Sequence, residues 1–179
     1  MVRLVQSTNG TMTLDDLKNY KVIVKQPLTI NYRGYNVFTT EAPSSGAVCL
    51  AILKAMEQFP LEDISDLNLS THRFDEVMRF AYGARQQLGD PAYIRNIDIE
   101  QYQKYMLSEE KARDVRSRIR DDRTLPVKDY MDKAVYTSEG HGTSHIVTAD
   151  SSGLTVTSTT TVNILFGAQI MTADTGIIM

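Results

Sequence analysis

The sequence predicts an α+β fold, because stretches with apolar residues at helical spacing and stretches of alternating, β-branched residues both occur within its 179 residues. The helical spacing is clearest after Gly46, and the strand pattern is clearest after Gly142. Hydrophobic residues make up 42% of the chain, which suits a globular protein with its own core. We therefore expect one structural domain.

Near the amino end, Thr13 precedes Leu-Asp-Asp-Leu, the pattern of an N-cap followed by acidic residues in the first helical turn. We expect a short helix there. Residues 21–25 are alternating and β-branched and predict a strand. Residues 28–39 show the same pattern and predict two strands around a turn at Gly34.

The breaker of residues 43–46 precedes an amphipathic helix that reaches Phe59, with Ser44 or Ser45 placed to cap its first amides. Cys49 lies in the apolar stripe of this helix, so we expect it to pack in the core. A second helix begins near Ser70 or Thr71 and ends at Gly89. Its expected buried side chains are Phe74, Val77, Met78, Ala81 and Leu88.

Residues 99–123 predict a short helix followed by a highly charged one on the surface. Residues 124–142 have weak periodicity and predict an extended loop. Beyond them, Asp-Ser-Ser-Gly at 150–153 separates two Thr- and Val-rich runs, the second extending to Gly167, and predicts a β-hairpin.

The hairpin brings its two ends together. If the turn lies at 150–153, Thr143 faces Thr160 or Thr161 across the ladder. Side chains alternate along a strand, so Thr161 and Asn163 are expected on one face, beside Thr143. A hydroxyl cluster next to an amide would result.

Thr143 is the candidate nucleophile. A threonine hydroxyl needs an adjacent base, and the amine of the same residue can serve once that residue is the chain terminus. Gly142 suits a cut before Thr143, because an unhindered glycine can adopt the strained backbone that brings the hydroxyl onto its carbonyl. On these features alone, an ordinary Thr-rich strand is the favoured interpretation, because Gly-Thr at the start of a strand is common.

Other candidate sites are weaker. His145 on a strand is more typical of a structural residue than of a catalytic base. His141 and His145 are four residues apart, but the glycines at 140 and 142 disfavour the helix that a shared zinc site would need. Cys49 is the only cysteine, which excludes an internal disulfide. We expect no metal and no cofactor.

Charge and hydropathy exclude further classes. The formal net charge of -3 argues against binding nucleic acid or an anionic membrane, since phosphate binding relies on clustered Lys and Arg. The basic residues of 111–123 alternate with Asp and indicate a solvated helix face. We identify neither a signal peptide nor a run of about 18 apolar residues that could span a membrane.

Beyond these patterns, the chain resembles the γ-glutamyltransferase (glutathione hydrolase) family along nearly its whole length. The matching blocks are Asn9-Gly10-Thr11-Met12-Thr13-Leu14-Asp15-Asp16-Leu17, Tyr32-Arg33-Gly34-Tyr35, Pro43-Ser44-Ser45-Gly46, Leu88-Gly89-Asp90-Pro91, Gly142-Thr143-Ser144-His145 and Thr159-Thr160-Thr161-Val162-Asn163. The resemblance implies the αββα sandwich of N-terminal-nucleophile hydrolases, incomplete here. It also implies that residues 1–142 correspond to the end of a large subunit and 143–179 to the start of a small one.

The same resemblance implies site roles. Thr143 matches the nucleophile, which is freed by autocleavage after Gly142 and forms a γ-glutamyl ester. Thr161 matches the hydroxyl that hydrogen-bonds the nucleophile, and Asn163 matches a residue that binds the donor's α-amino group. The implied donors are glutathione and other γ-glutamyl compounds, and the implied acceptors are water, an amino acid or a peptide.

Parts of the family's active site have no counterpart in these residues. An arginine for the donor carboxylate, the oxyanion-hole glycines and paired serines fall outside the matching blocks, so we expect the chain to be an inactive fragment. The alternative is a non-catalytic remnant or interaction module that retains the fold. Family members are usually extracytoplasmic, and the chain itself carries no signal for localisation.

Overall fold

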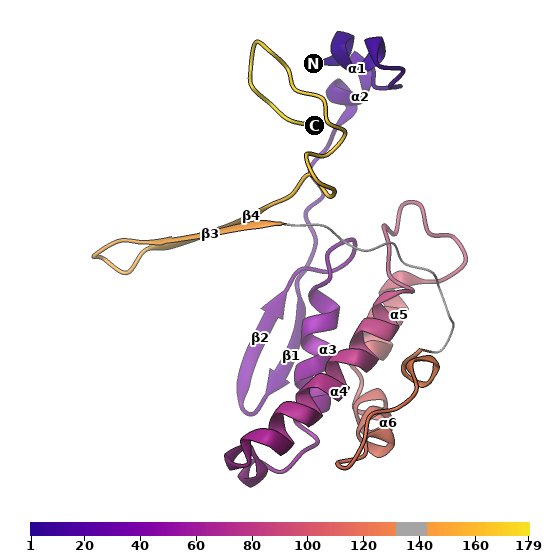
Figure 1. The fold of residues 1–179 in the computed structure, drawn as a ribbon, viewed down its shortest axis with the longest axis vertical. Coiled ribbons are helices and arrows are strands. Elements are labelled where there is room, and N and C mark those ends of the chain that lie inside the picture. The colour runs from indigo at the N-terminus through magenta and orange to yellow at the C-terminus, as the bar shows by residue number, and fades with distance from the viewer. Residues whose placement is uncertain (132–142) are drawn as a thin grey trace. The chain divides into compact units, whose positions relative to one another are not determined.

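The computed structural model describes residues 1–131 and 143–179. The chain forms two compact units, one of residues Val24–Tyr136 and the other of Met1–Ile23 together with Thr137–Met179. The first contains helices α3 to α6 and is called the helical unit below. The second contains the long hairpin β3–β4 and is called the hairpin unit (Figure 1).

Strands β1 (Leu28–Tyr32) and β2 (Tyr35–Thr39) form an antiparallel pair in the helical unit. The turn between them consists of Arg33 and Gly34, whose φ angles of 51° and 89° are both positive. A two-residue turn with two positive φ angles matches the twist of the strands that it joins. The hairpin predicted around Gly34 is confirmed.

Residues 21–25 form no strand, so that prediction is wrong. Val22 and Val24 are 77% and 91% exposed, and none of the strands in the described residues pairs with this segment. A β-branched run becomes a strand only when a neighbour takes up its backbone hydrogen bonds.

Helix α3 (Gly46–Met56) follows the predicted breaker, but Ser45 occupies the N-cap position without a capping hydrogen bond. Its hydroxyl instead accepts a hydrogen bond from Nε of Arg85 at 3.1 Å. Cys49 is exposed, which corrects the expected core position. The other residues of α3 are buried or half-buried, so the apolar stripe of the helix packs in the core without Cys49.

Helix α4 (Leu67–Arg85) begins earlier than Ser70 because the Asp66 carboxylate caps it, accepting the backbone N–H of Leu69 at 3.1 Å. It ends four residues before Gly89. Val77 and Ala81 are buried as predicted, and Met78 and Leu88 pack partly buried against them. Phe74 is 42% exposed and was wrongly expected inside. The first turn already contains Leu67 and Leu69, but Ser70 and Thr71 resemble a capping position and moved the predicted start too far along the chain.

Two helices follow as predicted: α5 (Ile99–Met106), capped by Asp98, and the charged α6 (Glu109–Arg118), capped by Ser108. A short 3-10 helix, η1 (Glu62–Ser65), precedes α4, and another, η2 (Val127–Tyr130), lies within the predicted loop. The remainder of that loop, residues 132–142, lies outside the described residues.

The core of the helical unit lies among α3, α4 and α6, with contributions from α5 and η2. Its buried residues are Ala47, Val48, Ile52, Ala55, Phe59, Val77, Phe80, Ala81, Met106, Val115, Ile119 and Tyr130. Removing these side chains from water provides the main free energy that holds the helices together.

The hairpin unit begins with α1 (Val2–Ser7) and α2 (Leu14–Asn19). Thr13 is the N-cap of α2 and forms a capping box with Asp16, as predicted. Strands β3 (Ser144–Ala149) and β4 (Thr155–Thr160) pair antiparallel around the predicted turn.

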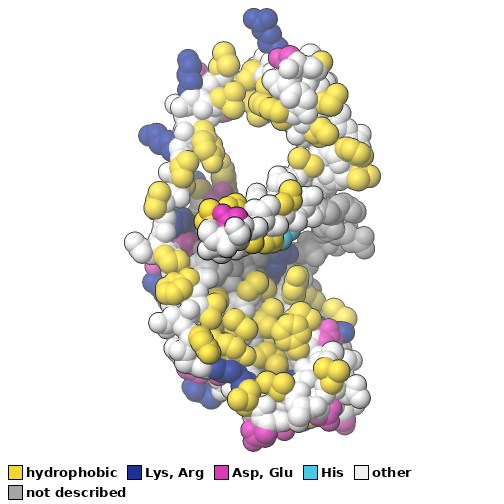
Figure 2. Space-filling model, turned by 90° about the vertical axis from the view of Figure 1, so that its left-hand side faces the viewer, with side chains coloured by type: hydrophobic (Ala, Val, Ile, Leu, Met, Phe, Trp, Pro, Cys, Tyr) yellow, Lys and Arg dark blue, Asp and Glu magenta, His cyan; other side chains and the backbone are white. Residues whose placement is uncertain are grey.

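Both hairpins expose apolar side chains. Hydrophobic residues gather on the face drawn in Figure 2, and exposed ones on the four strands include Tyr35, Phe38, Ile146, Val147 and Val156. Two-stranded sheets with exposed apolar side chains are marginally stable alone and suit packing against further structure. Within the described residues, no helix is both long and apolar enough to cross a membrane.

Candidate functional site

The register of β3 and β4 decides which hydroxyl faces Thr143. Ser144 pairs with Thr160, and the ladder continues in step to Ala149 opposite Thr155. The ladder ends at the pair of Ser144 and Thr160, and extending its register by one step would put Thr143 opposite Thr161. The sequence left Thr160 and Thr161 open as partners, and the ladder favours Thr161.

A cavity lies at the end of the β3–β4 hairpin opposite its turn, and Thr143 and Thr161 both line it. It has a volume of about 360 Å³ and is lined by Thr143, Ser144, Thr160, Thr161 and Val162. Thr143 and Thr161 therefore border one space, which is large enough for a small ligand and is open to solvent. Gly142, the other partner of the expected cut, lies outside the described residues.

Asn163 follows Thr161 by two residues, but it does not lie on a strand as predicted. β4 ends at Thr160, so the expected strand to Gly167 does not form and the alternation that would place Asn163 beside Thr161 stops. Asn163 instead has a φ of 73°, and its backbone N–H donates to Oγ1 of Thr161 at 3.0 Å. Asparagine tolerates this left-handed backbone. The hydrogen bond from the Asn163 N–H to the Thr161 hydroxyl replaces the backbone hydrogen bond that a longer strand would make.

His145 lies on the same face of β3 as Thr143, two residues along. Its Nδ1 is 2.7 Å from Oγ1 of Thr159, the residue opposite it in the ladder. This cross-strand contact is what a structural histidine on a sheet would make, in line with the prediction for His145. His141, the other member of the zinc pair considered above, lies outside the described residues.

The carboxylate of Asp150 fixes the turn, and the sequence analysis did not single it out. One of its oxygens accepts the backbone N–H groups of Ser152 and Leu154 at 2.8 Å and 3.1 Å, and the hydroxyl of Ser152. The side-chain and backbone hydrogen bonds from Ser152 lower the pKa of Asp150 below its usual value. An Asp at the start of Asp-Ser-Ser-Gly was the available signal.

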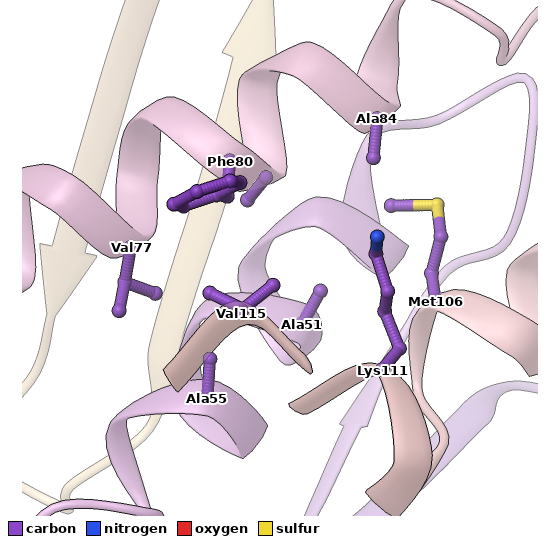
Figure 3. A pocket seen from close by; sticks show the side chains of 9 residues that line it. Ala51, Ala55, Val77, Phe80, Ala84, Met106, Lys111 and Val115 are labelled. Carbon is purple, nitrogen blue, oxygen red and sulfur yellow. The ribbon is translucent and has the colours of Figure 1, made fainter. Parts of the chain in front are cut away.

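A second space lies inside the helical unit and is too small for a ligand. Its volume is about 20 Å³, enough for one water molecule, and Val77, Phe80 and Met106 contribute to its apolar wall (Figure 3). The Lys111 side chain also lines it, and its Nζ makes an ion pair with Asp114 at 3.1 Å. This space is a packing defect among α3 to α6.

In residues 1–131 and 143–179, no three or more acidic, histidine or cysteine side chains lie close enough together to hold a metal ion.

Comparison with known proteins agrees with these features. The family model described as Gamma-glutamyltranspeptidase matches residues 1–179. The Glutathione hydrolase proenzyme of Arthroderma benhamiae is 46% identical over 180 residues, and the Glutathione hydrolase of Aspergillus flavus is 41% identical. Each match covers 100% of this chain and 30% of the relative, so the chain spans about a third of the length of these proteins.

Two solved structures match the fold. The gamma-glutamyltranspeptidase of Helicobacter pylori has a TM-score of 0.60 and 26% identity, covering 73% of this chain and 38% of its own. The enzyme of Pseudomonas nitroreducens, complexed with L-DON, has a TM-score of 0.56 at 18% identity, covering 71% and 38%. The predicted α+β class and the N-terminal-nucleophile hydrolase fold are confirmed, in part of its extent.

Proposed function

This chain belongs to the gamma-glutamyltranspeptidase family, and we propose that it forms the part of such an enzyme that carries the nucleophile. The donor is glutathione or another γ-glutamyl compound, because the relatives are named glutathione hydrolases. The acceptor is water, an amino acid or a peptide. The observation that supports the proposal is that Thr143 and Thr161 both line the 360 Å³ cavity at the open end of the β3–β4 hairpin.

The first proposed step is autocleavage. The hydroxyl of Thr143 attacks the carbonyl carbon of Gly142, the peptide C–N bond breaks, and the nitrogen of Thr143 takes a proton to become a free amine. Water then hydrolyses the Gly142 ester and restores the hydroxyl. The cut divides the chain into pieces of residues 1–142 and 143–179, which correspond to the large and small subunits.

The second proposed step is γ-glutamyl transfer. The new amine of Thr143 accepts the proton of its own hydroxyl, which attacks the γ-carbonyl of the donor and releases the donor's amine. The γ-glutamyl group remains on Thr143 as an ester until water or an acceptor amine resolves it. Thr161 supplies a hydrogen bond to the nucleophile, and the side-chain oxygen of Asn163 accepts one from the donor's α-ammonium group.

We further propose that residues 1–179 alone do not turn over a donor. A tetrahedral oxyanion needs preorganised N–H donors, worth about 3 kcal/mol each, and we assign none within the described residues. The alternative function, a non-catalytic remnant or interaction module, requires none of this chemistry.

Mass spectrometry of the intact protein separates the two proposals. The enzyme proposal expects fragments that end at Gly142 and begin at Thr143. Thr143→Ala abolishes the cut, Thr143→Ser retains it, and the neighbouring Ser144→Ala serves as the matched control that is still cut. An uncut wild-type protein that releases no aniline from a γ-glutamyl anilide supports the non-catalytic alternative.

A further inference from the structure

The backbone at Asn163 adopts a rare conformation beside the candidate site. The N–H of Ile164 donates to the carbonyl oxygen of Val162 at 3.0 Å, and Asn163 between them has a φ of 73°. A hydrogen bond that closes three residues around a positive φ is a γ-turn of the rare, strained kind. Residues 162–164 are called the γ-turn below. Val162 also lines the cavity that Thr143 and Thr161 share.

The γ-turn has no buried side chain that could hold it in place. Residues 161–166 are all exposed. A sparsely populated backbone conformation persists only where surrounding contacts determine it, and it relaxes when they are lost. The contacts that hold this turn must therefore come mainly from neighbouring backbone.

Gly167 is where the following backbone meets the γ-turn. Gly167 is buried, and its N–H donates to the carbonyl oxygen of Ile164 at 2.8 Å. A Cβ at Gly167 would lie 2.6 Å from the backbone oxygen of Met179 and 3.1 Å from the Cβ of Val162. Only glycine therefore lets the γ-turn lie this close to the end of residues 167–179, which are called the closing loop below.

The closing loop is itself held together by hydrogen bonds. The N–H of Ala168 donates to the backbone oxygen of Met179, and the N–H of Met179 donates to the carbonyl oxygen of Ile170 at 3.0 Å. Further along, the buried hydroxyl of Thr172 accepts the N–H of Ile177 at 3.2 Å. The loop thus gives Gly167 a fixed surface to pack against.

We propose that Gly167 is a positioning residue for donor binding. Its close contact with Met179 and Val162 holds the γ-turn and thereby keeps the amide of Asn163 beside the cavity. A side chain at position 167 would force the loop and the turn apart and release the strained backbone at Asn163. This inference rests on the proposed function, in which Asn163 binds the donor's α-ammonium group.

Gly167→Ala is the test variant, and Gly176→Ala is its matched control. Both glycines belong to the closing loop and have positive φ angles, 58° and 68°, so alanine meets a similar backbone cost at each position. A Cβ at Gly176 would have nothing within 4 Å, whereas one at Gly167 would overlap backbone atoms. The difference between the two variants therefore reports the contact at Gly167.

The measurement is kcat and KM for a γ-glutamyl anilide with the full-length enzyme produced from the complete reading frame. Gly167→Ala should raise KM about fivefold with kcat little changed, because it weakens one hydrogen bond to the donor. Gly176→Ala should keep the KM of the wild type. A loss of folded enzyme alone would lower the apparent kcat and leave KM unchanged.

A double-variant cycle tests whether Gly167 acts through Asn163. Asn163→Gly alone should raise KM about tenfold. If Gly167 serves only to position the Asn163 amide, adding Gly167→Ala to Asn163→Gly should raise KM no further. Independent effects would multiply instead, to roughly fiftyfold.

A second variant covers the case in which Gly167→Ala yields no folded enzyme. Thr172→Val removes the hydroxyl that accepts the Ile177 N–H, keeps the shape of the side chain and so loosens the closing loop from its other end. It should raise KM in the same direction, again with no further effect in the Asn163→Gly background.

Each failure has its own signature. A wild-type full-length enzyme that does not turn over the anilide, or an unchanged KM in Asn163→Gly, overturns the proposed function on which the inference rests. If Asn163→Gly does raise KM, an unchanged KM in Gly167→Ala overturns the role of Gly167. An equal rise in Gly176→Ala, or independent effects in the double variant, overturns it as well.

Discussion

The hydroxyl of Thr159 lies 2.7 Å from Nδ1 of His145, the residue opposite it in the β3–β4 ladder. The histidine therefore has a cross-strand partner that fixes its ring. The hydroxyl of Thr161 accepts the backbone N–H of Asn163 at 3.0 Å, and Thr161 lines the same cavity as Thr143.

In the full-length enzyme of which we propose this chain to be part, Thr161→Val should slow γ-glutamyl turnover about fivefold. Valine keeps the shape and the β propensity of threonine but cannot hydrogen-bond the nucleophile, and one lost hydrogen bond costs about 1 kcal/mol. The measurement is kcat/KM for a γ-glutamyl anilide. Thr157→Val, two pairs further along the same face, is the control and should match the wild type; equal losses in both variants would assign the effect to the strand.

Tyr130→Phe should lower the free energy of unfolding of the helical unit by about 3 kcal/mol, because it leaves the buried Glu76 carboxylate without its hydroxyl donor. Glu76→Gln keeps an oxygen that can accept from Tyr130 and should cost less, about 1 kcal/mol. Urea denaturation followed by circular dichroism measures both. The double variant Glu76→Met with Tyr130→Phe should recover part of the loss, and a purely additive result would contradict the pairing.

Alkaline pH should destabilise the same unit. Burial, and then the hydrogen bond to Glu76, raise the pKa of Tyr130 above its ordinary 10.0. A raised folded-state pKa means that the stabilisation is fully present below pH 10 and is lost as pH rises through the folded-state value.

Denaturation midpoints between pH 8 and pH 11 test this expectation. Other tyrosines and lysines titrate in both proteins, so the informative quantity is the difference between wild type and Tyr130→Phe. That difference should shrink above pH 10. A constant difference over the whole range would show that ionisation of Tyr130 does not contribute.

Local patterns predicted much of this structure. The cap at Thr13, the turn at Gly34, the two helices within 99–123 and the turn of the second hairpin all depend on residues a few positions apart, whose preferences are visible in sequence. Capping chemistry also explains an error: Asp66 caps α4, whereas we expected the helix to begin near Ser70 or Thr71.

Contacts between residues far apart in the chain could not be predicted from the sequence. Glu76 and Tyr130 are 54 residues apart, and the buried Gln103 accepts the N–H of Ala42 at 2.7 Å from 61 residues away. Only packing of the whole unit brings such groups together. The strand expected at 21–25 failed for the same reason, since pairing depends on a partner elsewhere in the chain.

Arg73→Lys should destabilise the helical unit by about 2 kcal/mol. The Arg73 guanidinium donates to both carboxylate oxygens of Asp121, at 2.8 Å and 2.9 Å, and to Asp63 at 2.6 Å. The side-chain hydrogen bonding from Arg73 to Asp121 is the main cause that holds the pKa of Asp121 below its usual value. An ammonium group keeps the charge but cannot form the planar two-point contact.

Thermal unfolding compares Arg73→Lys with Arg123→Lys. Arg123 pairs with Asp122 at 3.8 Å, both side chains are exposed, and its replacement should leave the midpoint unchanged. Equal shifts of the unfolding midpoint in the two variants would mean that the two-point contact of Arg73 with Asp121 adds no stability beyond that of an exposed ion pair.

Asn163→Gly separates the backbone of Asn163 from its side chain. Glycine adopts the φ of 73° without strain, so the turn after β4 and the cut at Thr143 should be preserved, whereas alanine would add a backbone cost of about 1 kcal/mol. If the amide binds the donor's ammonium group, Asn163→Gly in the full-length enzyme should raise KM for a γ-glutamyl anilide about tenfold, with kcat less affected. Gln169→Gly is the matched control, because Gln169 also has a positive φ, 58°, and lies outside the proposed site. An unchanged KM in Asn163→Gly would leave Asn163 with a backbone role only, since its N–H to Thr161 is retained by glycine.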